Sequence, residues 1–278
     1  MYIIFQLKKL AKRLIKLLEK ILPHFFFDRL YSVIFSIYKS FVRIIYSFKV
    51  IKYYLTINKD GIKMVREIYK VMPYTLVGAG GLEATYKLAK LMNKNSVEGN
   101  FVELGVARGG CAALMASVAF ENGQTNKRQL WLFDSFAGLP SPTQEDFLGG
   151  QTGDHLSPLA KGFCLGTIEE VRKLMFERFS FPEGKVFFIK GWFQDTLPVE
   201  GKHIGNIAIL RIDGDWYEST KCCLEYLYGQ VVSKGAVIVD DYQNCFGCKK
   251  AVDEFLNSRS INVKLNFDGR GGCYFLKP

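Results

Sequence analysis

Short apolar runs that alternate with helix-length segments are the feature that most constrains the fold of this chain. Seven runs have the apolar, β-branched or aromatic composition of buried strands: FVELG (101–105), QLWLFD (129–134), KVFFIK (185–190), IAILRID (207–213), AVIVDD (236–241), VKLNF (263–267) and CYFLK (273–277). The first five are separated by segments long enough for crossover helices, which include 109–121, 167–179 and 219–229. This alternation predicts an α/β fold with a doubly wound, mostly parallel sheet. The short DGRGG connection between the last two runs predicts a closing antiparallel strand.

Acidic residues recur where these predicted strands end. They are Glu103, Asp134, Asp213, Asp240 and Asp241. Ligands of doubly wound sheets bind beyond the carboxyl ends of the strands, near the point where the strand order reverses. We therefore expect these acids to face one cleft, where water, a ligand or a metal ion can compensate their charges.

The first strand leads into a glycine-containing turn with the pattern E-x-G-x-x-x-G. In FVELGVARGG, Gly105 allows a tight turn and close approach of a ligand, and Gly109 opens the next helix. Glu103 is placed to bind a cationic or hydroxylated ligand group. Asp134 ends the second strand, where nucleotide-binding sheets hold ribose hydroxyls with an acid. The alternatives are a turn that binds nothing and, for Asp134, a cap of the following turn.

The segment after the third strand, GWFQDTLP, brings aromatic residues to the same edge of the sheet. Trp192 and Phe193 could flank an adenine ring, although ordinary packing explains them equally well. Asp195 is expected to cap the short helix that follows.

Four aspartates, in DGD (213–215) and DD (240–241), form the second candidate site. Like charges this close need compensation, and hard carboxylate oxygens suit Mg²⁺, Mn²⁺ or Ca²⁺. A metal ion would lower the pKa of a bound substrate hydroxyl, and a carboxylate that is not a ligand could accept its proton. Separate turns and caps are the alternative. The CFGC pair (245–248) has zinc-like spacing without a second pair nearby, which disfavours zinc.

The N-terminal segment differs in charge from the rest of the chain, whose net charge is +10. Residues 1–60 hold 12 basic and 3 acidic residues, while residues 61–278 hold 25 and 24. We therefore divide the chain into a helical extension (1–60) and a main domain (61–278). Leu7, Leu10 and Leu14 recur at helical spacing between lysines, Pro23 is expected to break this helix, and a second helical stretch covers about 28–55.

Two readings of residues 1–55 remain open: peripheral contact with an anionic membrane, or packing on protein, including a second copy of the chain. Charged residues interrupt every apolar stretch, which argues against a spanning helix and a signal peptide. Seven cysteines without a disulfide framework favour a reducing, cytoplasmic location, which includes the inner face of a membrane. The near-neutral main domain argues against nucleic-acid binding.

Residues 65–277 resemble the macrocin O-methyltransferase (TylF-type) family. The resemblance rests on FVELGVARGG, DSFAGLP, GWFQDTLP, LRIDGDWYEST and VIVDDYQNCFGCKKAVDEF, in that order. It implies a class I methyltransferase, Rossmann-like fold, S-adenosylmethionine as cofactor and a divalent metal, usually Mg²⁺. The lead-in PYTLVGAGGLEATYKLAKL (73–91) resembles the family's lid over the cofactor.

The resemblance also implies roles for single residues. Asp213, Asp240 and Asp241 would bind the metal, and Asp215 would be the general base, with Asp213 beside it in the catalytic group. The residues expected to contact the cofactor are Tyr74, Thr75, Glu103, Gly105, Gly109, Asp134, Ser135 and Trp192.

The function that follows from these motifs is methylation of a hydroxyl on a sugar or glycan, with lipid-linked or surface glycans as candidate acceptors. Two rivals remain open. One is a metal-dependent methyltransferase of a catechol-like phenol, and the other is a membrane-surface glycan-binding or scaffolding protein with a vestigial site. A nicotinamide oxidoreductase is disfavoured, because the G-x-G-x-x-G pattern is absent after the first strand.

Overall fold

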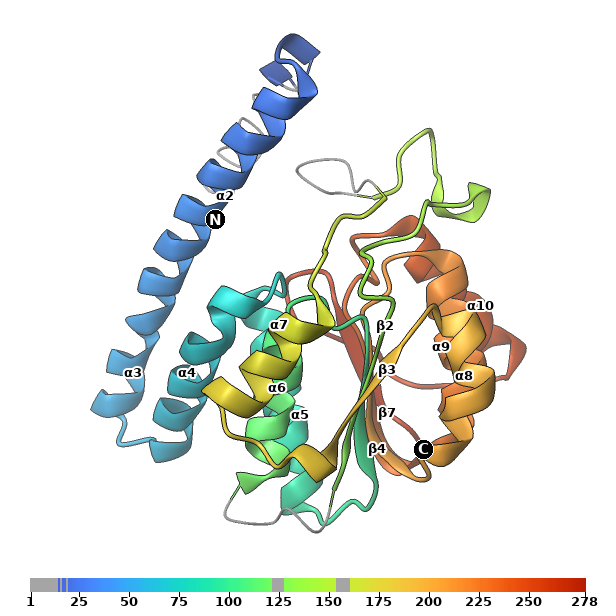
Figure 1. Cartoon of the computed structure of the whole chain (residues 1–278). Coiled ribbons are helices and arrows are strands. Elements are labelled where there is room, and N and C mark those ends of the chain that lie inside the picture. Colours follow the sequence, from blue (N-terminus) through green and yellow to red (C-terminus); the bar gives the residue numbers. More distant parts are fainter. Residues whose placement is uncertain (1–14, 16, 19, 122–127, 154–160) are drawn as a thin grey trace.

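The computed structural model describes residues 15, 17, 18, 20–121, 128–153 and 161–278 (Figure 1). Seven strands form one sheet in the order β3-β2-β1-β4-β5-β7-β6. They are β1 (Asn100–Leu104), β2 (Leu130–Asp134), β3 (Val186–Lys190), β4 (Ile207–Ile212), β5 (Val231–Val239), β6 (Asn266–Phe267) and β7 (Cys273–Leu276). Strands β1 to β5 are parallel, and β7 is antiparallel to both β5 and β6. The predicted doubly wound sheet with an antiparallel closing strand is confirmed.

Two strands differ in length from the prediction. β5 begins at Val231 rather than at Ala236, and its register with β4 shifts between Ile207 and Ile209. The exposed pair Ser233 and Lys234 interrupts the apolar pattern at this irregularity. For this reason the apolar run did not predict the first half of the strand. β6 pairs through Asn266 and Phe267 only, and residues 263–265, which were expected in this strand, have no strand conformation.

Helices cover both faces of the sheet (Figure 1). One face carries α4 (Lys59–Val71), α5 (Ala79–Lys94), α6 (Gly110–Ala119) and α7 (Ile168–Arg172). The other face carries α8 (Phe193–Glu200), α9 (Tyr217–Leu227) and α10 (Phe246–Ser258). Neighbouring residues of β1, Phe101 and Val102, belong to the two different cores, as the alternation of side chains along a strand requires.

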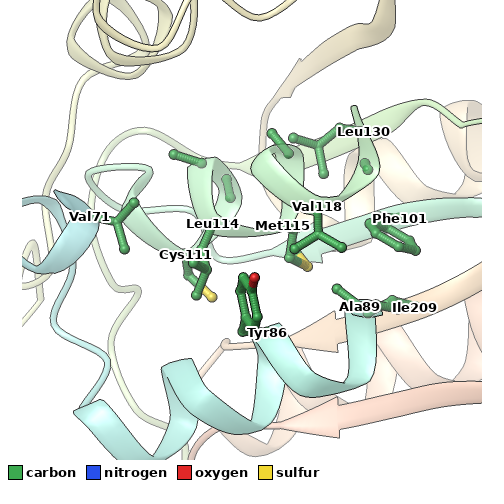
Figure 2. Close-up of a cluster of buried hydrophobic side chains, with 14 of the residues drawn as sticks. Val71, Tyr86, Ala89, Phe101, Cys111, Leu114, Met115, Val118, Leu130 and Ile209 are labelled. Atoms are coloured by element: carbon green, nitrogen blue, oxygen red, sulfur yellow. The ribbon is translucent and has the colours of Figure 1, made fainter. Parts of the chain in front are cut away.

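The first of these cores is tightly packed. Figure 2 shows Tyr86 of α5 pointing at the side of α6 that carries Leu114, Met115 and Val118. These α6 side chains and Phe101 of β1 are at most 1% exposed. Helix α6 therefore packs against both α5 and strands β1 and β2, and these contacts fix the turn that precedes it.

The N-terminal segment forms α2 (His24–Ser47) and α3 (Lys49–Leu55), with Pro23 at the N-cap of α2 as expected. Tyr46 is 7% exposed, belongs to the first core and donates a hydrogen bond to Glu83 Oε1 at 3.0 Å. The N-terminal part of α2 projects beyond the α/β body (Figure 1). The amphipathic helix predicted from Leu7 to Lys20 lies largely outside the described residues. Among the described helices, none is long and apolar enough to cross a membrane.

Candidate active site

A cavity of about 840 Å³ opens at the carboxyl ends of the parallel strands. Its walls come from the loops after β1, β2, β3, β4 and β5, together with Tyr38 of α2 and the turn before β7. This is the edge of the sheet where β1 and β4 lie side by side, although β1 is followed by β2 in the chain. The cavity therefore lies at the switch point in strand order, as predicted, and the size of the cavity suits a small-molecule ligand.

Gly105 brings the turn after β1 into close contact with the loop after β4, and both line the cavity. It has φ +88°, and a Cβ atom at this position would lie 1.8 Å from the backbone oxygen of Asp213. The backbone N–H of Asp213 donates to Leu104 O at 2.8 Å, and the N–H of Gly105 donates to Phe133 O at 2.9 Å. The turn after β1 is therefore packed directly against the acidic loop after β4, and a side chain would separate them.

We expect Gly105→Ala to destabilise the protein by about 1–3 kcal/mol and to weaken cofactor binding. Alanine is strained at this positive φ, and its Cβ atom would push β1 away from β4. Gly184→Ala is the matched control, since a Cβ there would meet no atom of the described residues within 4 Å. Chemical denaturation and cofactor titration of both variants measure the difference. Equal behaviour of the two variants would contradict the close contact.

Asp134 uses its carboxylate to hold the turn after β1. Its Oδ2 accepts hydrogen bonds from the backbone N–H groups of Val106 (2.6 Å) and Ala107 (2.9 Å), and its Oδ1 accepts from Phe136 N (2.6 Å). Burial raises the pKa of Asp134, while these three hydrogen bonds act in the opposite direction. The carboxylate still lines the cavity, so it both shapes the turn and faces a ligand.

The other expected cofactor residues divide into two groups. Thr75, Ser135 and Trp192 line the cavity, as do Glu103 and Gly105.

Tyr74 and Gly109 do not appear among the lining residues. Tyr74 packs behind α6, where its backbone lies 2.7 Å from the position of a Cβ on Gly110. Gly109 is the N-cap of α6, has φ +82°, and faces Val171 of α7. Their placement indicates roles in seating α6 under the cavity. Asp195 is also not the cap that the sequence suggested: Trp192 is the N-cap of α8, without a side-chain hydrogen bond.

The acidic residues after β4 and β5 converge in one place. Ligand atoms of Asp213, Asp240 and Asp241 lie within 4.8 Å of one another. The Oδ2 atom of Asp241 is buried and has no hydrogen-bond partner among the described residues. An unsatisfied carboxylate oxygen beside two further carboxylates is a donor set that fits a hard divalent cation.

A second triad shares Asp241 with Asp215 and Cys245. The thiol of Cys245 lies 3.8 Å from Asp215 Oδ1 and donates toward it. Burial and the nearby carboxylates, of which Asp241 is the strongest, raise the pKa of Cys245. A protonated thiol is a poor ligand, so the three-carboxylate set is the better metal site. The other CFGC cysteine, Cys248, is buried in the second core.

Arg211 lies beneath the acids and was not among the predicted site residues. Its side chain is 0% exposed. Its Nη2 atom lies 3.0 Å from Asp213 Oδ2 and 2.9 Å from Asp240 Oδ1, and its Nε lies 3.2 Å from Glu103 Oε1. The Nε also donates to the sulfur of Cys111 at 2.9 Å. One buried cation thus joins the acid of the cofactor turn to two of the candidate metal ligands.

Burial weakens the acidity of three of these aspartates. It raises the pKa of Asp213 and Asp241, with further increases from Asp240 and Asp215 respectively. Burial, followed by the charge of Asp240, raises the pKa of Asp215 to about 7. A carboxylate with such a pKa is suited to accept a proton near neutral pH.

Glu103 should make the metal-free protein less stable as the pH rises. Burial raises its pKa to about 7, against the opposing effect of Arg211, from an ordinary value of 4.5. Between these two pH values the folded state keeps a proton that the unfolded state has lost. The contribution of Glu103 to the free energy of unfolding therefore falls across this window, by no more than about 3 kcal/mol.

Glu103→Gln should remove that part of the pH dependence, because glutamine does not titrate. Urea denaturation in EDTA at about pH 5 and about pH 8 compares the two proteins. We expect the variant to lose less stability than the wild type between the two conditions. The same loss in both proteins would show that Glu103 keeps an ordinary pKa.

Two site residues that sequence reasoning missed carried only weak signals. Arg211 is a charged residue inside an otherwise apolar run, which indicates a buried partner but does not say which one. Tyr38 lies in residues 1–60, which the sequence analysis assigned to the helical extension. Its side chain lines the cavity because α2 packs against the main domain.

The comparisons with known proteins agree with these features. The family model described as Macrocin-O-methyltransferase (TylF) matches residues 12–277, so the match extends further towards the N-terminus than residues 65–277, where the motifs lie. Demethyldecarbamoylnovobiocin O-methyltransferase of Streptomyces niveus is 36% identical over 203 residues, which cover 73% of this chain and 75% of that protein.

A second relative, the 8-demethyl-8-(2,3-dimethoxy-alpha-L-rhamnosyl)-tetracenomycin-C 4'-O-methyltransferase of Streptomyces olivaceus, is 34% identical over 71% of this chain and 74% of its own. Among solved structures, the O-methyltransferase NovP superposes with a TM-score of 0.63 at 36% identity, over 73% of this chain and 82% of NovP. The calicheamicin methyltransferase CalS11 has a TM-score of 0.56 at 17% identity, over 79% of this chain and 93% of CalS11, and shares the fold.

Proposed function

The chain belongs to the macrocin O-methyltransferase (TylF) family, and from that premise we propose that it transfers the methyl group of S-adenosylmethionine to a sugar hydroxyl with the help of Mg²⁺. The observation that carries this proposal is the convergence of Asp213, Asp215, Asp240 and Asp241 at one cavity with the Gly105 turn. We assign the methyltransferase domain to residues 61–278, with residues 1–60 as its helical extension.

The residues around the Gly105 turn would hold the methyl donor. S-adenosylmethionine supplies an electrophilic methyl group when bound. Glu103 and Asp134 would bind its amino acid and ribose parts, with Ser135, Thr75 and Trp192 lining the same side of the cavity. Tyr74 and Gly109 would act indirectly, by seating α6.

Asp213, Asp240 and Asp241 would hold the metal ion. A bound Mg²⁺ lowers the pKa of a hydroxyl that it contacts. Arg211 already engages one oxygen each of Asp213 and Asp240, so their carboxylates are oriented before any cation binds. Asp215 would then accept the proton of the acceptor hydroxyl at its own carboxylate, and its pKa of about 7 suits that role.

The acceptor class follows from the relatives. One is named for a rhamnosyl-tetracenomycin 4'-O position, and another, Mycinamicin III 3''-O-methyltransferase of Micromonospora griseorubida, is 29% identical over 75% of this chain and 80% of its own. We propose a sugar or glycan acceptor, carried on a lipid or a surface polysaccharide. The seven free cysteines support a reducing, cytoplasmic location, in which the inner face of a membrane is accessible.

Calorimetric titration of S-adenosylmethionine and its demethylated product tests the donor site, with Mg²⁺ and then with EDTA. We expect binding in both conditions, because the residues that would hold the donor are not among the candidate metal ligands. Methylation of sugar acceptors should occur with Mg²⁺, fall by at least about 100-fold in EDTA and return when Mg²⁺ is restored. Absence of donor binding to folded protein would refute the proposal, and methylation of catechols but not sugars would replace the acceptor class.

A further inference from the structure

Helices α2 and α3 carry apolar side chains on two opposite sides. One side, with Val42, Tyr46, Val50 and Tyr53, packs against the body of the protein. At 3.6 residues per turn, Ile37, Phe41, Ile44, Phe48, Ile51 and Leu55 point about half a turn away. Packing on the body of the protein explains the apolar residues of the first side but not those of the second.

The second side, which we call the outer face, is exposed along its whole length. Ile37 is 65% exposed, Phe41 60%, Phe48 61% and Leu55 81%. Large apolar side chains scattered singly on a surface are ordinary, but a continuous row at helical spacing marks an interaction surface.

The segment that carries the outer face is also strongly basic. Residues 1–60 hold 12 basic and 3 acidic residues, and the rest of the chain is nearly neutral. Lys39 and Arg43 donate to the backbone oxygens of Thr75 and Tyr69 on the body. Lys20, Arg29 and Lys52 are exposed.

We propose that the outer face of α2 and α3 lies flat on an anionic lipid bilayer, with its apolar side chains among the acyl chains and its basic residues at the headgroups. An apolar face within a strongly basic segment is the combination that anionic bilayers bind. A second copy of the chain would cover the same apolar face, but it would bring two equally basic segments together, and their repulsion disfavours that pairing. Among the described helices none could span the bilayer, so the contact is peripheral.

The same helix reaches the active-site cavity. Tyr38, one residue after the exposed Ile37, belongs to the cavity lining. A bilayer bound along α2 would therefore lie beside the cavity wall. In combination with the proposed function, this position favours an acceptor sugar that is carried on a lipid over one that diffuses freely.

Vesicle sedimentation with the full chain tests the docking. Vesicles of equal parts phosphatidylcholine and phosphatidylglycerol are compared with vesicles of phosphatidylcholine alone. We expect at least about tenfold stronger binding to the anionic vesicles, and weaker binding at high salt. The double variant Ile37→Glu/Phe41→Glu should reduce that binding by at least about tenfold, because it places charges on the outer face.

The matched control is Val199→Glu/Tyr226→Glu, which alters two exposed apolar residues of α8 and α9. It should bind vesicles like the wild type, and both double variants should keep the wild-type melting temperature and S-adenosylmethionine affinity. Wild-type protein that stays in solution with anionic vesicles, or equal binding by the Ile37 variant, would overturn the docking. A lipid-free dimer that the Ile37 variant dissociates, without vesicle binding, would assign the outer face to a second copy. None of these outcomes depends on methyl transfer, so the proposed function stands or falls separately.

Discussion

Replacing Asp215 with asparagine is expected to lower turnover by about 10²–10⁴-fold while S-adenosylmethionine binds as before. Asp215 is 8% exposed and lies beside the carboxylates of Asp240 and Asp241. Asparagine keeps the size of the side chain but cannot accept the proton of the acceptor hydroxyl. The loss should therefore appear in kcat rather than in donor affinity.

The backbone conformation at position 215 should be unchanged by the substitution. Asp215 has φ +56°, in the left-handed region that asparagine adopts as readily as aspartate. The loop between β4 and α9 should keep its shape, and removal of one charge from a crowded acid group should not lower stability. A kinetic assay, a cofactor titration and a melting curve separate the three effects.

The pH dependence of kcat is an independent test of Asp215 as the base. The pKa of Asp215 is about 7 without a cation, and a bound cation lowers it. Wild-type kcat should therefore rise with pH and level off at or below about pH 7, and the residual activity of Asp215→Asn should lack this rise. Asp195→Asn, at an exposed aspartate of α8, is the control and should keep both activity and profile. Full activity in Asp215→Asn would remove this residue as the base.

Replacing Arg211 with methionine should cost about 3–5 kcal/mol of the free energy of unfolding at neutral pH in EDTA. The change leaves Glu103, Asp213 and Asp240 without the cation that lies within 3.2 Å of each. Their repulsion, rather than the lost contacts of the arginine side chain, causes most of the loss. Chemical denaturation measures it.

Two conditions should restore part of this stability. Lowering the pH protonates Glu103 and Asp213, whose pKa values are raised, and Mg²⁺ supplies the missing positive charge, so the deficit of Arg211→Met should shrink in both. The exposed Arg66, replaced in the same way, should change stability by less than about 1 kcal/mol and respond to neither condition. A deficit that is independent of both pH and Mg²⁺ would mean that Arg211 acts through packing alone.

The sequence predicted the sheet well because each strand has a local signature. An apolar run and a flanking helical pattern are visible without knowledge of neighbours, and the doubly wound order then brings the ends of β1, β2, β4 and β5 to one edge. Asp213, Asp240 and Asp241 were expected together for that reason, and the structure places them together.

What the sequence could not predict depends on contacts between distant segments. Arg211 and Glu103 meet across two neighbouring strands, and which charges an interior arginine pairs with is decided by register. Tyr38 reaches the cavity because α2 packs on α4, a docking that periodicity does not specify. Asp195 is a smaller example: it lies inside the first turn of α8, and the N-cap is Trp192, whose side chain makes no capping hydrogen bond.

The close contact between Gly105 and the backbone of Asp213 has a consequence for how binding of S-adenosylmethionine and binding of Mg²⁺ affect each other. The turn that would hold the donor packs on the backbone of Asp213, whose carboxylate is one of the proposed metal ligands, so a displacement of either side is passed directly to the other. Thermodynamic linkage then requires reciprocity: whatever factor Mg²⁺ contributes to the affinity for S-adenosylmethionine, S-adenosylmethionine contributes to the affinity for Mg²⁺. Titrating S-adenosylmethionine in Mg²⁺ and in EDTA, and Mg²⁺ with and without S-adenosylmethionine, measures this shared factor from both sides.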